Sequence, residues 1–195
     1  MKDLIIYLLL LLSPVLVSSQ IFKDHTISVS YYGFATSEIL TNLTGAASVS
    51  GKKTHIFGLN YFHRVNKWIE FESGVEFGKY RFLISPNIPP GSPILPYEVD
   101  SEMLTIPAGF RMSYKGFFYF NAACLIDFNL SGTKGTITDQ SGVGIMAGIG
   151  IKYALFNKIA VFINPNLRIH KISKFRNNDS RMLKGSIRFG LGYCF

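Results

Sequence analysis

Carboxylates and cations that recur at every second position are the residues of this chain best suited to chemistry. Glu70, Glu72 and Glu76 alternate with apolar residues, so a strand would place all three carboxylates on one face. Cations occupy the corresponding polar positions of later alternating segments, at Arg111, Lys152, Arg168, Lys184 and Arg188. Enclosed by a wall of strands, these groups could form a proton or ion path, or they could neutralise one another in a filled network of salt bridges.

Histidines offer a second candidate chemistry, general acid–base catalysis. His55 and His170 fall near the outer ends of predicted strands, but neither has a serine two residues away on its own face, and Ser173 falls in a predicted loop. A catalytic nucleophile needs a base within hydrogen-bond reach and a third group that orients the base. We therefore expect no catalytic site, cofactor or metal site, and we expect His25 and His63 to be polar residues of a membrane interface.

Strands are the elements that would position these groups. Eight segments alternate apolar residues with polar residues or glycine, and we predict a strand in each: residues 26–34, 54–64, 68–82, 101–113, 117–130, 142–153, 159–170 and 183–195. Carboxylates on the hidden face of a soluble sheet would be costly, whereas a membrane barrel turns its apolar face to lipid and its polar face to the lumen. The sequence therefore predicts an all-β fold, an eight-stranded antiparallel up-and-down transmembrane β-barrel of the outer-membrane type. The alternative is a soluble barrel with its apolar face inside.

The connections between these segments alternate between long and short. Short turns are predicted at 65–67, 114–116 and 155–157, and longer loops at 35–53, 83–100, 131–141 and 171–182. In outer-membrane barrels the short turns face the periplasm, so both termini are predicted to be periplasmic. Aromatic residues typical of a membrane interface gather at the short-turn ends: Trp68, Tyr114, Phe118, Tyr153, Tyr193 and Phe195.

The N-terminal residues predict export. Lys2, an apolar run from Leu4 to Leu12 and a small-residue exit at Ser19 follow the plan of a signal peptide. Residues 1–19 are therefore predicted to be removed, which leaves 20–195 as one barrel domain. The net charge of +8 is scattered over turns, loops and one strand face, which favours contact with anionic outer-membrane lipids, including lipopolysaccharide, over binding to nucleic acid.

Strand parity yields two local predictions. Cys124 is predicted to face lipid and Cys194 the lumen, so the two thiols should remain unpaired. Pro107 and Pro165 fall inside strands, where each removes a ladder hydrogen bond, and a β-bulge is predicted at each.

The end of the chain resembles a known assembly signal. Its alternating apolar residues, which finish on an aromatic, are similar to the signal by which the outer-membrane assembly machinery recognises barrels. The matching residues are Ile187, Phe189, Leu191, Tyr193 and Phe195. The resemblance implies that this machinery is a partner during biogenesis.

The middle of the chain is similar to the PorT-like outer-membrane β-barrel family of Gram-negative bacteria. The similarity lies in the strand that runs through Leu104, Ile106 and Pro107 to Tyr114, and in the glycine-rich segment from Gly142 to Tyr153. It implies a location in the cell outer membrane and a role in transport or in a secretion complex, and it carries over no catalytic residue.

Three functions remain open from the sequence. The first is a structural, adhesive or partner- and ligand-binding role, exerted through extracellular loops at 35–53, 83–100 and 171–182. The second is transport or membership of a secretion apparatus, as the PorT-like resemblance implies, and the third is lipid modification by a barrel enzyme. Side chains fill the interior of an eight-stranded barrel, so the sequence favours the first function and predicts little or no conductance.

Overall fold

The computed structural model describes residues 24–40, 48–86, 95–131, 140–156, 158–174 and 181–195. The predicted signal peptide lies outside the described residues. Within these ranges, no helix has the length and apolar character needed to cross a membrane.

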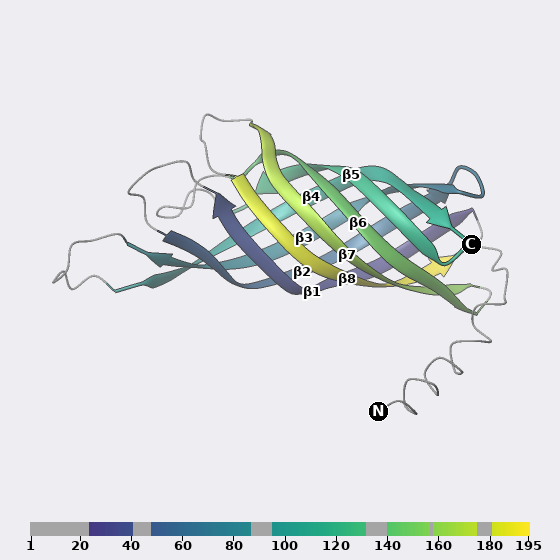
Figure 1. Ribbon diagram of the computed structural model, residues 1–195, viewed down its shortest axis with the longest axis horizontal. Coiled ribbons are helices and arrows are strands. Elements are labelled where there is room, and N and C mark those ends of the chain that lie inside the picture. Colours follow the sequence, from purple (N-terminus) through teal and green to yellow (C-terminus); the bar gives the residue numbers. More distant parts are fainter. Residues whose placement is uncertain (1–23, 41–47, 87–94, 132–139, 157, 175–180) are drawn as a thin grey trace, which may run out of the picture.

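Antiparallel strands form a closed barrel in the described part of the chain (Figure 1). They are β1 (His25–Leu40), β2 (Ser48–Arg64), β3 (Ile69–Ser85), β4 (Tyr97–Tyr114), β5 (Phe118–Asn129), β6 (Gly142–Phe156), β7 (Ile159–Lys174) and β8 (Arg181–Cys194). Each strand pairs with its neighbours in sequence, and β1 also pairs with β8, where Thr26 lies opposite Cys194. The predicted all-β, eight-stranded up-and-down barrel is confirmed.

Several strands are longer than the sequence pattern predicts. β1 continues to Leu40 and β2 begins at Ser48, so most of the predicted loop 35–53 is strand. The predicted loops 83–100 and 171–182 shrink in the same way, because β3, β4, β7 and β8 all extend into them. Several of these extensions have apolar residues such as Ile84 and Val99 on the inner face and charged residues such as Glu98 on the outer face. They therefore lack the outward apolar alternation from which strands were predicted, although their backbones still pair.

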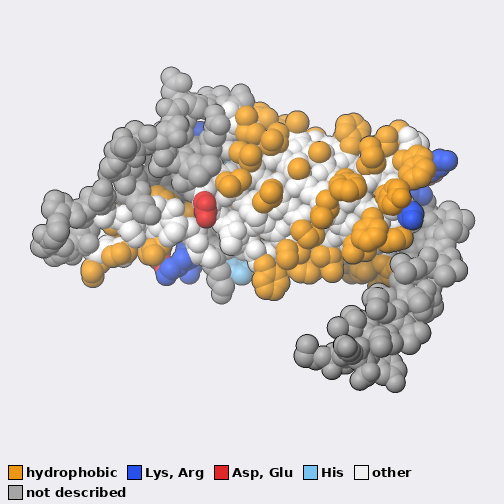
Figure 2. Space-filling view, in the orientation of Figure 1, with side chains coloured by type: hydrophobic (Ala, Val, Ile, Leu, Met, Phe, Trp, Pro, Cys, Tyr) orange, Lys and Arg blue, Asp and Glu red, His pale blue; other side chains and the backbone are white. Residues whose placement is uncertain are grey.

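The two faces of the wall differ as strand parity predicts. Apolar side chains form a band around the outer surface, and charged side chains lie toward its two ends (Figure 2). Every second residue turns inward, and the inward residues are mostly polar or charged. Cys124 is exposed on the outer wall and Cys194 is buried inside, and both thiols are free. The apolar face is therefore on the outside and the polar face on the inside, which is the reverse of a soluble barrel.

The two prolines inside strands do not produce the predicted bulges. Pro107 lies opposite Leu125 and Pro165 opposite Ile187, with the register unchanged on either side. The β-ladder tolerates each missing donor because one edge of a residue's backbone can stay unbonded while its neighbours hold the register. The register instead shifts elsewhere, as between Gly33 and Thr36, where Phe34 has a φ of 49°.

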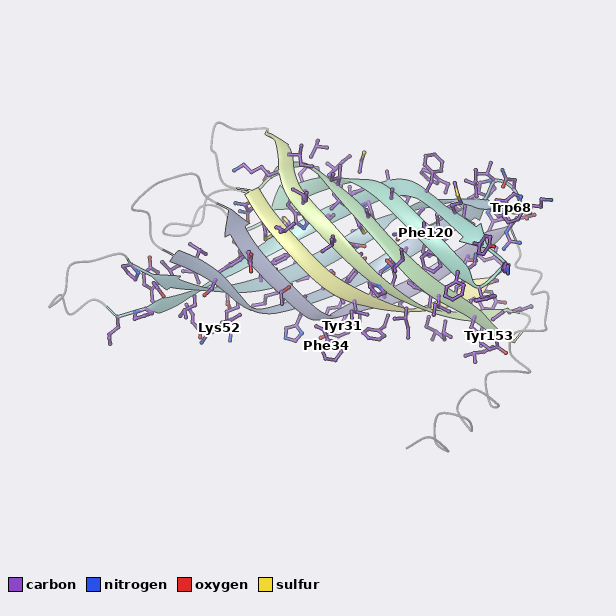
Figure 3. All side chains as sticks on the ribbon, viewed as in Figure 1. Tyr31, Phe34, Lys52, Trp68, Phe120 and Tyr153 are labelled. Atoms are coloured by element: carbon purple, nitrogen blue, oxygen red, sulfur yellow. The ribbon has the colours of Figure 1, made fainter. Side chains whose placement is uncertain are left out.

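The short turns lie together at one end of the barrel. Between β2 and β3, the Asn66 side-chain carbonyl accepts hydrogen bonds from the backbone N–H groups of Trp68 (2.8 Å) and Ile69 (2.9 Å). In such an Asx turn, the side chain takes the place of a backbone acceptor, so the chain can reverse beyond the end of the strand pairing. Trp68 and Tyr153 both lie near this end (Figure 3), and the start of β1 and the end of β8 lie there too (Figure 1).

Candidate functional site

Glu76 on β3 is the centre of a polar network that fills the middle of the barrel. Its carboxylate accepts hydrogen bonds from Arg168 Nη1 at 2.6 Å and Arg168 Nη2 at 3.3 Å, and from the hydroxyl of Tyr32. Arg168 Nη2 also donates to the Tyr32 hydroxyl at 2.5 Å. All three side chains are fully or almost fully buried. The geometry is a bidentate guanidinium–carboxylate pair with a tyrosine as a third member.

A second arginine links Glu76 to the next carboxylate. Arg188 on β8 forms an ion pair with Glu72, its Nη1 donates to the Tyr32 hydroxyl at 3.3 Å, and it lies 4.0 Å from Glu76. β8 lies between β7 and β1 in the barrel, so Arg188 reaches across the interior to the carboxylates of β3. The chain of charges therefore ties opposite walls of the barrel together.

The network continues toward the short-turn end through Glu70. Lys152 forms an ion pair with Glu70, and Arg64 lies 3.4 Å from the same carboxylate. Arg111 lies 3.8 Å from Glu70 and 3.9 Å from Glu72. These last two separations are too long for direct hydrogen bonds. As ion pairs, they nevertheless place Arg111 between Glu70 and Glu72, so the cations and carboxylates form one alternating series.

Arg111 is held by aromatic rings as well as by charge. Its guanidinium carbon lies 3.9 Å from the centre of the Phe62 ring, 4.1 Å from that of Tyr119 and 5.0 Å from that of Phe162. Stacking of a guanidinium on aromatic faces is favourable where water is excluded. A cavity of about 20 Å³ beside this cluster has room for about one water molecule.

Lys184 differs from the other lumen cations. It is fully buried, and its Nζ has no hydrogen-bond partner among the described residues. The ammonium group lies 5.4 Å from the centre of the Tyr32 ring and 5.3 Å from that of Tyr80. The structure therefore places all eight predicted lumen residues inside, but it joins seven of them into the ion-pair series and leaves Lys184 against aromatic rings.

Asp127 and His170 form a buried acid–histidine pair that the sequence pattern does not predict. His170 Nδ1 lies 2.8 Å from Asp127 Oδ2, and the Thr105 hydroxyl donates to Asp127 Oδ1 at 2.7 Å. Parity assigns each of these residues to the inner face, but the pattern does not show which inward residues meet across the lumen. Asp127, Tyr32 and Tyr80 are among the interior residues that the sequence pattern does not single out.

Apolar side chains close the interior on the side of the longer connections. This group, here called the apolar cap, is buried and consists of Tyr32, Ile56, Tyr80, Phe82, Ile84, Met103 and Met182. Val49 and Val99 pack against it. The cap and the charged network meet at Tyr32, whose hydroxyl donates to Glu76.

The two histidines considered for catalysis do not come together. His55 lies on the outer wall with its Nδ1 2.8 Å from the Tyr31 hydroxyl, whereas His170 is buried in the lumen, so the two rings are on opposite sides of the wall. His25 and His63 stack at 4.8 Å at the short-turn end. Among the described residues, no group of three or more histidine, cysteine or acidic side chains could hold a metal ion.

The residues of the proposed assembly signal lie on the outer wall of β8 and just beyond its end. Phe189, Leu191, Tyr193 and Phe195 are exposed, and Ile187 is half-buried. The backbone N–H of Phe195 donates to the carbonyl of His25 at 2.9 Å, and the two rings stack at 5.7 Å. The start of β1 thereby covers part of the last residue of the signal.

Charged side chains cover the outer face of the strand ends that project beyond the apolar band. This outer ledge consists of residues 49–54 of β2, 79–85 of β3 and 97–102 of β4, and the last of these extends past the point where β5 ends. Its ion pairs join Lys52 with Glu98 (2.7 Å), Arg81 with Asp100 (2.8 Å), and Lys79 with Asp100 (3.7 Å) and Glu102 (3.8 Å). The hydrogen bond from Arg81 lowers the pKa of Asp100, and that from Lys52 lowers the pKa of Glu98.

The fold and the outward apolar band define a class, the small outer-membrane β-barrel proteins. The outer membrane protein OprG of Pseudomonas aeruginosa has a similar structure, with a TM-score of 0.55 and 10% sequence identity over 89% of this chain and 97% of OprG. Neisserial surface protein A is also similar, with a TM-score of 0.52 and 15% identity over 89% of this chain and 98% of that protein. At such identities the likeness concerns the fold alone.

Sequence comparisons add no closer relative. No family model matches the chain, and no curated protein sequence matches it. The resemblance to the PorT-like family therefore stays a hypothesis.

Proposed function

We propose that this protein is a small outer-membrane barrel without a pore, with a structural or partner- and ligand-binding role exerted at its extracellular end. The observation that carries the proposal is the filled interior. Ion-paired side chains occupy the middle of the lumen, and the apolar cap lies over them. A solute would have to break both layers to pass.

The surface left for a partner is then the extracellular end, which includes the outer ledge and the connections beside it. The ledge presents cations and carboxylates together, and its β-strand edges are charged rather than apolar. Charged edges discourage non-specific strand pairing, so the ledge suits a specific partner. In this orientation both termini are periplasmic, as the short turns are.

Conductance in planar bilayers tests the closed interior. We expect the purified full chain to give no steady, well-defined channels at physiological salt concentration. A control is the variant Lys79→Ala, because Lys79 lies on the outer ledge and its loss leaves the lumen unchanged. Steady channels of uniform size from the wild-type protein would contradict the proposal.

The alternative role, a component of transport or secretion, predicts a stable partner. Co-purification from detergent-extracted membranes would reveal a stoichiometric partner in that case, whereas a free-standing barrel purifies alone. The enzymatic alternative predicts a chemical change in lipid A between cells with and without the protein. We expect no such change, because the two histidines considered for catalysis lie on opposite sides of the wall.

A further inference from the structure

A long groove crosses the outer wall of the barrel between β1 and β5. Its volume is about 640 Å³, and its sides are formed by Phe34, Phe120, Ile149, Leu167 and Ile187. Ala147, with a small side chain, and Gly185, which has none, also line it and keep the groove open. None of its lining residues is charged.

Two features of the chain create this groove. A Cβ added at Gly185 would make only ordinary contacts, 3.5 Å to Thr36 and 3.6 Å to Leu167, so a larger side chain there would extend into the groove. Phe34 lies within the register shift in β1 and has a φ of 49°, a region that costs free energy for a bulky residue. That conformation leaves 82% of Phe34 exposed, and its side chain projects from the outside of β1 (Figure 3).

The dimensions and polarity of the groove identify its occupant. From β1 across β8, β7 and β6 to β5 there are four interstrand spacings, which amount to about 19 Å at about 4.8 Å each. With strands tilted by about 40°, this length descends through about 12 Å of the bilayer, close to the depth of one leaflet of a hydrocarbon core about 30 Å thick. A single lipid chain has this length.

We propose that the groove binds one acyl chain of a bilayer lipid at a fixed position on the barrel. The groove is continuous with the apolar band, which is the lipid-facing surface of this fold. Because it has no charged lining residue, it selects the chain and is indifferent to the headgroup. The site is independent of any extracellular partner.

A second apolar groove on the same wall serves as a control. It has a volume of about 520 Å³, is lined by Phe57, Tyr31, Phe189 and Ile163, and spans β7 to β2. This span is three interstrand spacings, about 14 Å, so it is shorter than the proposed site. Phe57 is 61% exposed, which makes Phe57→Ala a matched control for Phe34→Ala.

Native mass spectrometry of the full chain tests the proposal. The protein is reconstituted in vesicles of dipalmitoyl phosphatidylethanolamine and dipalmitoyl phosphatidylglycerol, extracted in a mild detergent, and examined for retained lipid. We expect one lipid per barrel with either headgroup. Phe34→Ala and Gly185→Leu should each reduce retention about tenfold, equivalent to about 1.4 kcal/mol, and Phe57→Ala should retain lipid as the wild type does. Heat-modifiable gel mobility verifies that each variant is folded, and Phe34→Ala keeps the test valid if Gly185→Leu does not fold.

Four results would overturn the inference. They are a wild-type barrel that retains no lipid, equal losses in Phe34→Ala and Phe57→Ala, a tenfold preference for one headgroup, and a dimer that Gly185→Leu dissociates. The third result would indicate headgroup recognition, and the fourth would make a second copy of the chain the occupant.

Discussion

Replacing Glu76 by glutamine removes one charge from the centre of the lumen and keeps the side-chain size. The carboxylate has hydrogen bonds from Arg168 and Tyr32 and lies 4.0 Å from Arg188. In the variant, the fully buried guanidinium of Arg168 loses its carboxylate partner among the described residues, whereas Arg188 keeps its ion pair with Glu72. Removing one partner of a buried ion pair costs about 3–5 kcal/mol, because it leaves an uncompensated charge. We expect Glu76→Gln to lower the free energy of unfolding by that amount.

Urea unfolding in phosphatidylcholine vesicles measures this loss. Trp68 is the only tryptophan and lies near the short-turn end (Figure 3), so its fluorescence reports the transition, and gel mobility after mild heating gives a second readout. Glu98→Gln is the control. Glu98 is on the exposed outer ledge, where a salt bridge contributes little, so no measurable change is expected.

A double variant separates charge from packing. Glu76→Leu with Arg168→Met removes both members of the central pair, and replacing a buried pair by apolar residues of similar volume is often nearly neutral. The double variant should therefore recover most of the stability that Glu76→Gln loses. A cost below about 1 kcal/mol for Glu76→Gln, or a double variant that is less stable than the single one, would refute the view that unpaired charge dominates.

Three further changes test other parts of the molecule. The pKa of Asp100 should lie below its usual value of 3.8 because of the hydrogen bond from Arg81. The contribution of Asp100 to the stability of the ledge is then complete above pH 3.8 and is lost as the pH falls through the lowered pKa. Arg81→Gln should raise the pKa of Asp100 that carboxyl carbon NMR measures. Gly150→Ala places a methyl group against the Tyr119 ring and should destabilise the barrel by about 1–3 kcal/mol in urea unfolding. Deleting Phe195 should slow assembly in cells more than it lowers the stability of the refolded barrel, and normal insertion of this variant in a membrane-fractionation assay would contradict the assembly signal.

The sequence predicts the barrel well because a transmembrane strand obeys a strict rule. Lipid on one side and a polar lumen on the other impose alternation on every membrane-spanning residue. The inward direction of Glu72, Arg168 and Arg188 follows from parity alone, and all three side chains are buried. The ends of β1, β3 and β4 were missed because charged residues such as Glu98 and Asp100 lie on the outer face beyond the apolar band, so the outward apolar alternation that indicates a membrane strand stops there.

Partners across the lumen could not be predicted from the pattern. Parity states that Arg188 and Glu72 point inward, but contact between β8 and β3 depends on the tilt and stagger of the closed barrel. The same limit applies to Asp127 and His170, which lie on β5 and β7. The bulges predicted at proline fail for another reason, since a strand can lose one donor without shifting its register.

The seam between β1 and β8 has a consequence for the order of folding. Seven seams join strands that are consecutive in sequence, whereas this one brings together residues 168 positions apart, Thr26 and Cys194. Loop-closure entropy grows by about 0.6 kcal/mol for each doubling of length, so closing this seam costs only about 2 kcal/mol more than closing a hairpin of about 20 residues. The contacts of this seam nevertheless join the residues furthest apart in sequence among the strands that the structure describes, and distant contacts form late. Until β8 pairs with β1, the edges of both strands therefore stay unpaired and open to any insertion factor.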